Sequence, residues 1–266
     1  TTDINVGRNV TQNISESIQL WAAGPSAPTN MVALDAMNSA PGQIETFTMN
    51  DSKYAIVTSG NAGVGNIIYM WDVSDPSNIV QTATSYTLNG ARGVDIFTAG
   101  YNTYAIVVGH QGKGVEIIDV SDPANLMSIG TLFDTYSLSL DAPTDVDVFT
   151  IGSSTYAIVA SGEGAYDYDS GVQILDISDP ITMIPKGTLQ DTGSLELHGA
   201  YAVETFTIGF NTYAIVASWL DSGVQILDIS DPANIVATDA ETDGVNGFNL
   251  LAAPGDVDVF TIGSST

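Results

Sequence analysis

The sequence predicts an all-β fold, a β-propeller built from four-stranded antiparallel blades. Two pairs of identical segments point to it: residues 170–180 and 222–232 both read SGVQILDISDP, and residues 145–155 and 256–266 both read DVDVFTIGSST. The repeated segments are short, rich in β-branched and aromatic residues, and bounded by Gly, Asn, Ser, Asp and Pro, as β-strands are. One structural unit is therefore used several times along the chain.

Each unit is expected to hold four strands, which the copy at 203–237 defines best. Strand a covers 203–207, strand b 213–217, strand c 224–228 and strand d 234–237. Strand b is apolar at consecutive positions, which predicts that both of its faces are covered. Blades that lie between two other blades meet this condition.

A phenylalanine in strand a marks five copies, 50 to 57 residues apart: Phe47, Phe97, Phe149, Phe206 and Phe260. We expect a single propeller domain over 1–266, with blades at 42–90, 91–142, 143–199 and 200–253. Residues 1–41 resemble strands c and d, and residues 254–266 resemble strand a, so the two ends are expected to close a fifth blade. A fragment of a longer chain, with more blades, would carry the same pattern.

Strand c ends in a recurring Asp-x-Ser-Asp-Pro motif, at 72–76, 119–123, 176–180 and 228–232. Proline presets the backbone for a turn, and Asp and Ser side chains accept hydrogen bonds from nearby turn amides. We therefore interpret these aspartates as turn residues, with metal binding as the alternative.

Tyr-Ala-Ile-Val followed by Gly-Val-Gln-Ile-Leu-Asp-Ile-Ser-Asp-Pro resembles the LVIVD repeat, a propeller-type repeat of bacterial and archaeal surface proteins. The resemblance covers residues 43–242 in four copies, and the motif valine is Val57, Val107, Val159 and Val216. It implies the propeller fold and a surface or extracellular location. It brings no catalytic residues with it, because one fold hosts many chemistries.

The charge balance excludes some classes of partner. The chain has 31 Asp and Glu against 5 Lys and Arg, a net charge of −26, so nucleic acids and anionic membranes are repelled and cations attracted. No apolar stretch is long enough for a membrane helix. The absence of cysteine excludes disulfides and thiol catalysis.

Binding residues are expected on the face that holds the b–c loops and the d–a connections, because these vary while the a–b and c–d turns do not. An acidic loop there carries Glu163, Asp167 and Asp169, whose spacing could wrap oxygen ligands around Ca²⁺. A solvated acidic loop is the alternative. Four further candidates for ligand binding are Tyr166, Trp219, His110 and His198. Trp219 either stacks on a sugar ring or packs on the base of its loop.

An acidic residue stands two positions before each strand-a phenylalanine: Glu45, Asp95, Asp147, Glu204 and Asp258. Because strand a is the innermost strand, these acids are expected to form a ring around the central channel. Such a ring either recruits a cation, with some pKa values raised, or accepts backbone hydrogen bonds from the neighbouring blade. We favour the backbone hydrogen bonds.

These features predict an extracellular or cell-surface scaffold without enzymatic activity, for structural assembly or for interaction with a protein or glycan. Ca²⁺ is the one cofactor expected, and unpaired terminal strand edges could drive self-assembly. The alternative is a carbohydrate-active enzyme, a glycoside hydrolase or lyase, with Glu163, Asp169 and Asp221 as its acids.

Overall fold

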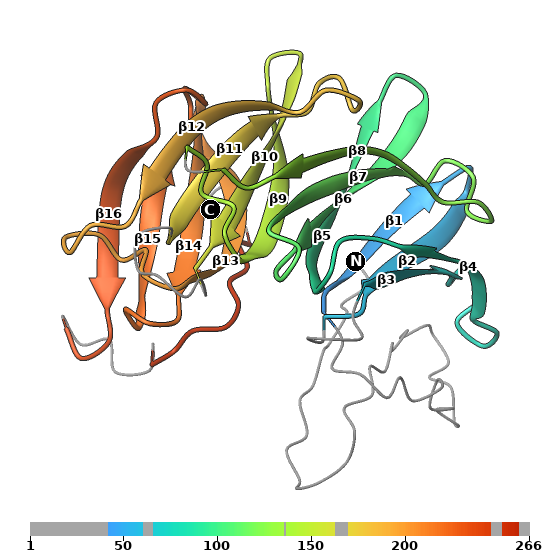
Figure 1. Ribbon diagram of the computed structural model, residues 1–266, viewed down its shortest axis with the longest axis horizontal. Helices are drawn as coiled ribbons and strands as arrows, with labels where there is room; N and C mark the ends of the chain where they lie inside the picture. Colours follow the sequence, from blue (N-terminus) through green and yellow to red (C-terminus); the bar gives the residue numbers. More distant parts are fainter. Residues whose placement is uncertain (1–41, 61–65, 136, 163–169, 246–251, 261–266) are drawn as a thin grey trace, which may run out of the picture.

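The computed structural model describes residues 42–60, 66–135, 137–162, 170–245 and 252–260. Within these ranges sixteen strands form four antiparallel sheets, and each sheet joins four strands that follow one another in the chain (Figure 1). The predicted all-β architecture of four-stranded antiparallel units is confirmed.

The strands follow the predicted a–b–c–d order in every sheet. The first sheet consists of β1 (Ile44–Met49), β2 (Ser52–Thr58), β3 (Ile67–Asp72) and β4 (Val80–Tyr86). The second consists of β5 (Ala91–Ala99), β6 (Asn102–Gly109), β7 (Gly114–Asp119) and β8 (Met127–Phe133). The third consists of β9 (Pro143–Ile151), β10 (Ser154–Ser161), β11 (Gly171–Asp176) and β12 (Ile184–Gln190). The fourth consists of β13 (Ala200–Ile208), β14 (Asn211–Ser218), β15 (Gly223–Asp228) and β16 (Val236–Thr242).

Neighbouring sheets pack face to face, and their first strands meet on the inside. Strand β9 contacts both β5 and β13, and β5 contacts β1. Three apolar clusters fill the spaces between successive sheets. The sheets therefore fan out from a common axis lined by β1, β5, β9 and β13 (Figure 1).

Strand β10 shows why strand b is apolar at consecutive positions. Ala157 and Val159 belong to the cluster shared with the second sheet, whereas Ile158 and Ala160 belong to the cluster shared with the fourth. All four side chains are fully buried. Because successive side chains of a strand point to opposite faces, both faces of this sheet are covered.

The Asp-x-Ser-Asp-Pro segments form hydrogen-bonded turns. Asp228 Oδ1 accepts a hydrogen bond from the Ser230 amide at 2.9 Å, and Ser230 Oγ accepts one from the Thr212 amide of β14 at 3.0 Å. The other three sheets repeat both contacts. The interpretation of these residues as turn formers is confirmed.

The expected closing blade falls largely outside the described residues, which do not include 1–41 or 261–266. Within 252–260 the backbone forms no strand. The fifth blade and the predicted domain boundaries stay predictions. No helix that could cross a membrane occurs in the part of the chain that the structure describes.

Candidate functional site

The b–c loops and the d–a connections lie together, as expected. In the fourth sheet the amide of Trp219, in the β14–β15 loop, donates to the carbonyl of Gly199 just before β13, at 2.9 Å. In the second sheet the amide of His110 donates to the carbonyl of Gly90 in the same way, at 3.0 Å. We call this side of the molecule the loop face.

Three long side chains meet at the loop face. The rings of Tyr201 and Trp219 lie 5.8 Å apart at an angle of 40°. The Arg92 guanidinium lies over the Tyr201 ring, 6.0 Å from the ring centroid. Arg92 is the second residue of β5 and Tyr201 the second of β13, so this contact joins the second and fourth sheets. The Trp219 side chain keeps 46% of its surface exposed.

The β14–β15 loop and the connection before β13 also carry two acids and a histidine. Asp221 accepts a hydrogen bond from the His198 amide at 2.8 Å, and the His198 Nδ1 atom lies 3.9 Å from the second Asp221 oxygen. Burial raises the pKa of Asp191, and the charge of Asp221 raises it further, while His198 opposes the shift. We define the loop-face cluster as these six residues: Arg92, Asp191, His198, Tyr201, Trp219 and Asp221.

The structure thus brings together three of the residues predicted from the sequence, namely Trp219, His198 and Asp221. His110 occupies the loop of the second sheet that corresponds to the Trp219 loop of the fourth. Glu163, Tyr166, Asp167 and Asp169 lie outside the described residues, so the calcium loop and two of the three proposed catalytic acids stay predictions.

Deeper along the axis, one hydrogen-bonded network joins the first strands of all four sheets. The Gln43 side chain accepts from the Val94 amide at 2.9 Å and donates to Asp145 Oδ1 at 2.6 Å. The other Asp145 oxygen accepts from the Val203 amide at 2.9 Å. Gln43 precedes β1, Val94 lies in β5, Asp145 in β9 and Val203 in β13.

Two acids of the predicted ring, Asp95 and Asp147, lie at the next level of the channel and bond the neighbouring sheet. Asp95 of β5 accepts from the Val148 amide of β9 at 2.7 Å, and Asp147 of β9 accepts from the Thr205 amide of β13 at 2.8 Å. For Asp95 and Asp147, the backbone hydrogen bonds that we favoured from the sequence are confirmed.

These acids hold protons more tightly than exposed acids do. Burial, followed by the charge of Asp147, raises the pKa of Asp95 to about 8. Burial raises the pKa of Asp145 to about 7, and burial with the nearby charges of Asp147 and Asp258 raises that of Glu204 to about 7. Burial also raises the pKa values of Glu45 and Asp147. Desolvation penalises each charged form, and like charges add to the penalty.

A cation in this ring stays a prediction. Among the described residues, no three His, Asp or Glu side chains are arranged so that they could hold a metal ion. The channel acids bind protons, and the carboxyl groups of Asp95 and Asp147 accept hydrogen bonds from backbone amides of the neighbouring sheet.

The channel network was not foreseen, and neither were Tyr201 and Asp191 of the loop-face cluster. Asp145 stands two residues before Asp147 within the repeated DVDVF segment. The corresponding positions are Gln43, Gly93, Ala202 and Asp256, so an acid recurs there in only one other copy. Tyr201 has no aromatic counterpart, because Arg92 and Thr144 occupy the equivalent position of β5 and β9. Asp191 corresponds to Asp134 and Asp243, which also follow strand d directly. The acid that follows strand d in three units is the signal that could have identified Asp191.

The LVIVD repeat model matches residues 101–134, 152–191 and 211–238. The chain contains LVIVD repeats. The first two matched segments run from an a–b turn through strands b, c and d of the second and third sheets, and the last runs from the start of strand b into strand d of the fourth. These segments carry the buried strand and the turn motif. No protein with curated annotation matches the sequence.

Solved structures resemble the LVIVD-repeat fold at low identity. A functionally unknown protein from Desulfotomaculum acetoxidans matches with a TM-score of 0.62 and 16% identity, over 91% of this chain and 65% of that one. The periplasmic gluconolactonase PpgL of Pseudomonas aeruginosa matches with a TM-score of 0.62 and 11% identity, over 89% of this chain and 67% of that one.

A GH32 β-fructofuranosidase from Bombyx mori matches with a TM-score of 0.52 and 12% identity, over 78% of this chain and 52% of that one. At such identities the likeness shows the fold alone, and that fold is the β-propeller. The LVIVD-repeat chain spans between about half and two thirds of the length of these three structures.

Proposed function

We propose that this LVIVD-repeat protein is a non-enzymatic binding scaffold, extracellular or on the cell surface, that recognises a glycan through the loop-face cluster. The observation that carries the proposal is the Tyr201–Trp219 ring pair, with nearly half of the Trp219 side chain open to solvent. Aromatic rings held on loops at a rigid scaffold offer flat apolar faces, and the tryptophan and tyrosine tips add hydrogen bonds.

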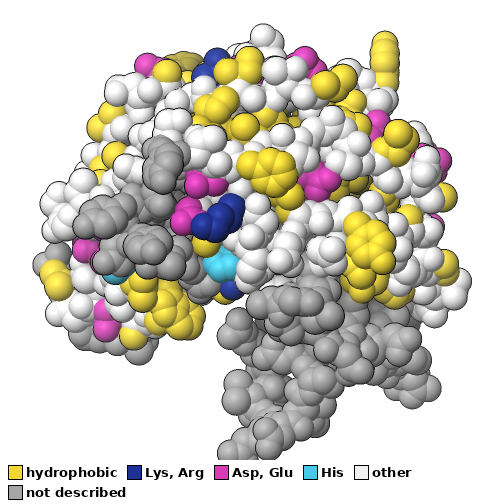
Figure 2. All heavy atoms as spheres, viewed as in Figure 1, with side chains coloured by type: hydrophobic (Ala, Val, Ile, Leu, Met, Phe, Trp, Pro, Cys, Tyr) yellow, Lys and Arg dark blue, Asp and Glu magenta, His cyan; other side chains and the backbone are white. Residues whose placement is uncertain are grey.

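Charge and surface composition support the same proposal. With a net charge of −26 the protein repels polyanions, and Lys and Arg side chains are sparse on the face shown in Figure 2. A neutral glycan escapes this repulsion. The partly exposed carboxylate of Asp221, in the same loop as Trp219, supplies acceptors for sugar hydroxyl groups.

Binding to an array of neutral glycans tests the proposal. The Trp219→Ala and Tyr201→Ala variants are expected to lose most of the binding, because each removes a stacking surface. Tyr86→Ala is the matched control, since Tyr86 is an exposed aromatic residue on the outer strand β4. Binding that survives both loop-face substitutions, or that is lost equally in the control, would rule out this site.

The rival function is a glycoside hydrolase or lyase, and one observation favours it. Asp191 has a raised pKa beside Asp221, and glycosidases use one protonated and one ionised carboxyl group. Release of reducing sugar from a polysaccharide panel, abolished by Asp221→Asn and Asp191→Asn, would establish the enzyme. If the parent protein releases none, the scaffold function stands.

A further inference from the structure

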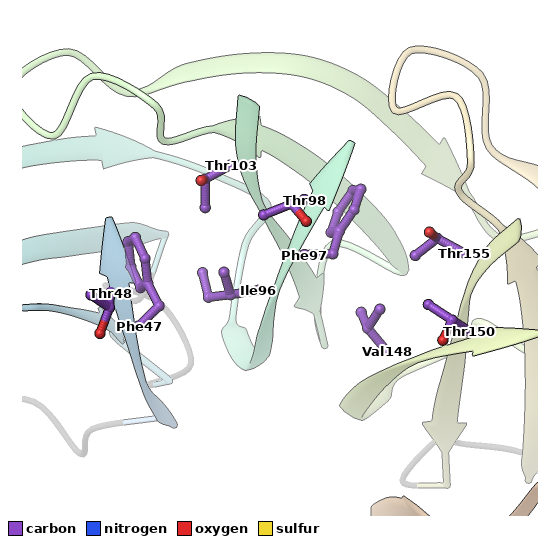
Figure 3. Close-up of a pocket in the computed structure, with 9 residues that line it drawn as sticks. All are labelled: Phe47, Thr48, Ile96, Phe97, Thr98, Thr103, Val148, Thr150 and Thr155. Atoms are coloured by element: carbon purple, nitrogen blue, oxygen red, sulfur yellow. The ribbon is translucent and has the colours of Figure 1, made fainter. Parts of the chain in front are cut away.

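A cavity of about 370 Å³ opens at the end of the channel opposite the loop face (Figure 3). It lies among the first three sheets, where the strands run into the a–b turns. Five threonines line it, from three sheets: Thr48, Thr98, Thr103, Thr150 and Thr155. We call it the threonine cavity.

The threonines come in pairs that the repeat sets in register. Thr98 of β5 stands opposite Thr103 of β6, and Thr150 of β9 stands opposite Thr155 of β10. Each hydroxyl group can donate and accept a hydrogen bond. Apolar walls complete the cavity, with Phe47 on one side and Ile96, Phe97 and Val148 between it and the Thr150–Thr155 pair (Figure 3).

None of the nine lining residues is ionisable, although the protein carries 31 acidic residues. Asp95 and Asp147 immediately precede Ile96 and Val148, so carboxyl groups lie just beyond the cavity in the channel. The net charge of −26 opposes an anion. The lining itself provides no counter-charge for a cation. Hydroxyl groups and apolar walls together suit a ligand that is neutral, hydroxylated and small.

We propose that the threonine cavity binds a small neutral saccharide. The sugar hydroxyl groups exchange hydrogen bonds with the threonine pairs, and its apolar C–H face lies against Phe47, Ile96 and Val148. The site is distinct from the loop-face cluster, because it lies at the other end of the channel and does not depend on the glycan site proposed there.

Saturation-transfer NMR with neutral mono- and disaccharides, including D-glucose, tests the proposal. D-glucosamine and D-glucuronate serve as cationic and anionic probes of matched shape, at about pH 6, where the amine is protonated. We expect at least one neutral saccharide to bind and D-glucuronate not to bind. If D-glucosamine binds and no neutral sugar does, the cavity is a site for organic cations. If none of the sugars binds, the cavity is not a saccharide site. Either result overturns the proposal.

Variants locate the binding. Thr98→Val combined with Thr150→Val removes two hydroxyl groups with little change of shape, and we expect affinity to fall roughly tenfold. Thr207→Val is the matched control, because Thr207 occupies the same repeat position in β13 but does not line the cavity. Thr150→Trp should block the cavity altogether. Unchanged saccharide affinity in the double variant and in Thr150→Trp would overturn the proposal, and Trp219→Ala should leave this binding intact.

Discussion

A single glycine allows the second and third sheets to approach each other at the axis. A Cβ atom on Gly93 of β5 would lie 2.7 Å from the Cα atom of Asp145 in β9, closer than real Cβ atoms come to backbone. Asp145 in turn anchors the network that includes Gln43 and Val203. The missing side chain at position 93 therefore leaves room for the hydrogen bonds that hold the first strands together.

Gly93→Ala is expected to destabilise the protein by about 1–3 kcal/mol, because the neighbouring backbone must shift to admit the methyl group. Gly193→Ala is the control, since a Cβ atom there meets nothing within 4 Å. Urea unfolding of the two variants measures the difference. Equal stability of both would mean that β5 and β9 are not in close contact.

At the scale of elements, a buried polar residue of strand c fastens each d–a connection. Gln173 of β11 accepts from the Ser139 amide of the connection and donates to the Gly187 carbonyl at 2.9 Å. Gln225 of β15 repeats this arrangement with the amide of Glu196 and the carbonyl of Asp239. Strand c therefore holds the segment that carries the loop face.

Replacing Gln173 by Leu should cost about 2–4 kcal/mol, because it leaves two buried backbone groups without their partner. Gln190→Leu, at the exposed end of β12, should change stability by less than about 0.5 kcal/mol. Thermal or urea unfolding checks both. A Gln173→Leu variant as stable as its parent would show that the connection is held by other contacts.

The strands themselves could be predicted because hydrophobic pattern and turn residues act over a few positions. The apolar run of β10 and the Asp-x-Ser-Asp-Pro turns are examples, and both proved to have the expected structure. The role of Gln173 could not be predicted from the sequence, because a polar residue in a strand is expected to face water. Likewise, the contact of Arg92 with Tyr201 depends on packing between sheets that are far apart in sequence.

At the scale of the whole molecule, acids from several sheets converge on one axis, so stability should depend on pH. The raised pKa values mean that the folded state binds more protons than the unfolded state between about pH 4 and pH 8. Stability is then fully present below the unfolded pKa of each group and is lost as pH rises through the folded pKa.

Melting temperature should therefore fall as pH rises from about 4 to about 8, with up to about 1.4 kcal/mol lost per pH unit for each acid that titrates. An Asp95→Asn variant should show a shallower slope, because it removes the group with the most strongly raised pKa. Salt should reduce the part of the slope that comes from surface repulsion and leave the buried part. A melting temperature that rises with pH over this range would contradict the claim that acids from several sheets are buried together at the axis.

The most direct measurement is a carboxyl carbon NMR titration of all 31 Asp and Glu side chains. If the sheets meet around a common axis as described, Asp95, Asp145 and Glu204 should titrate near pH 7–8. A titration in which every carboxyl group loses its proton below about pH 5 would contradict it, because acids that behave as free in water cannot be packed between sheets.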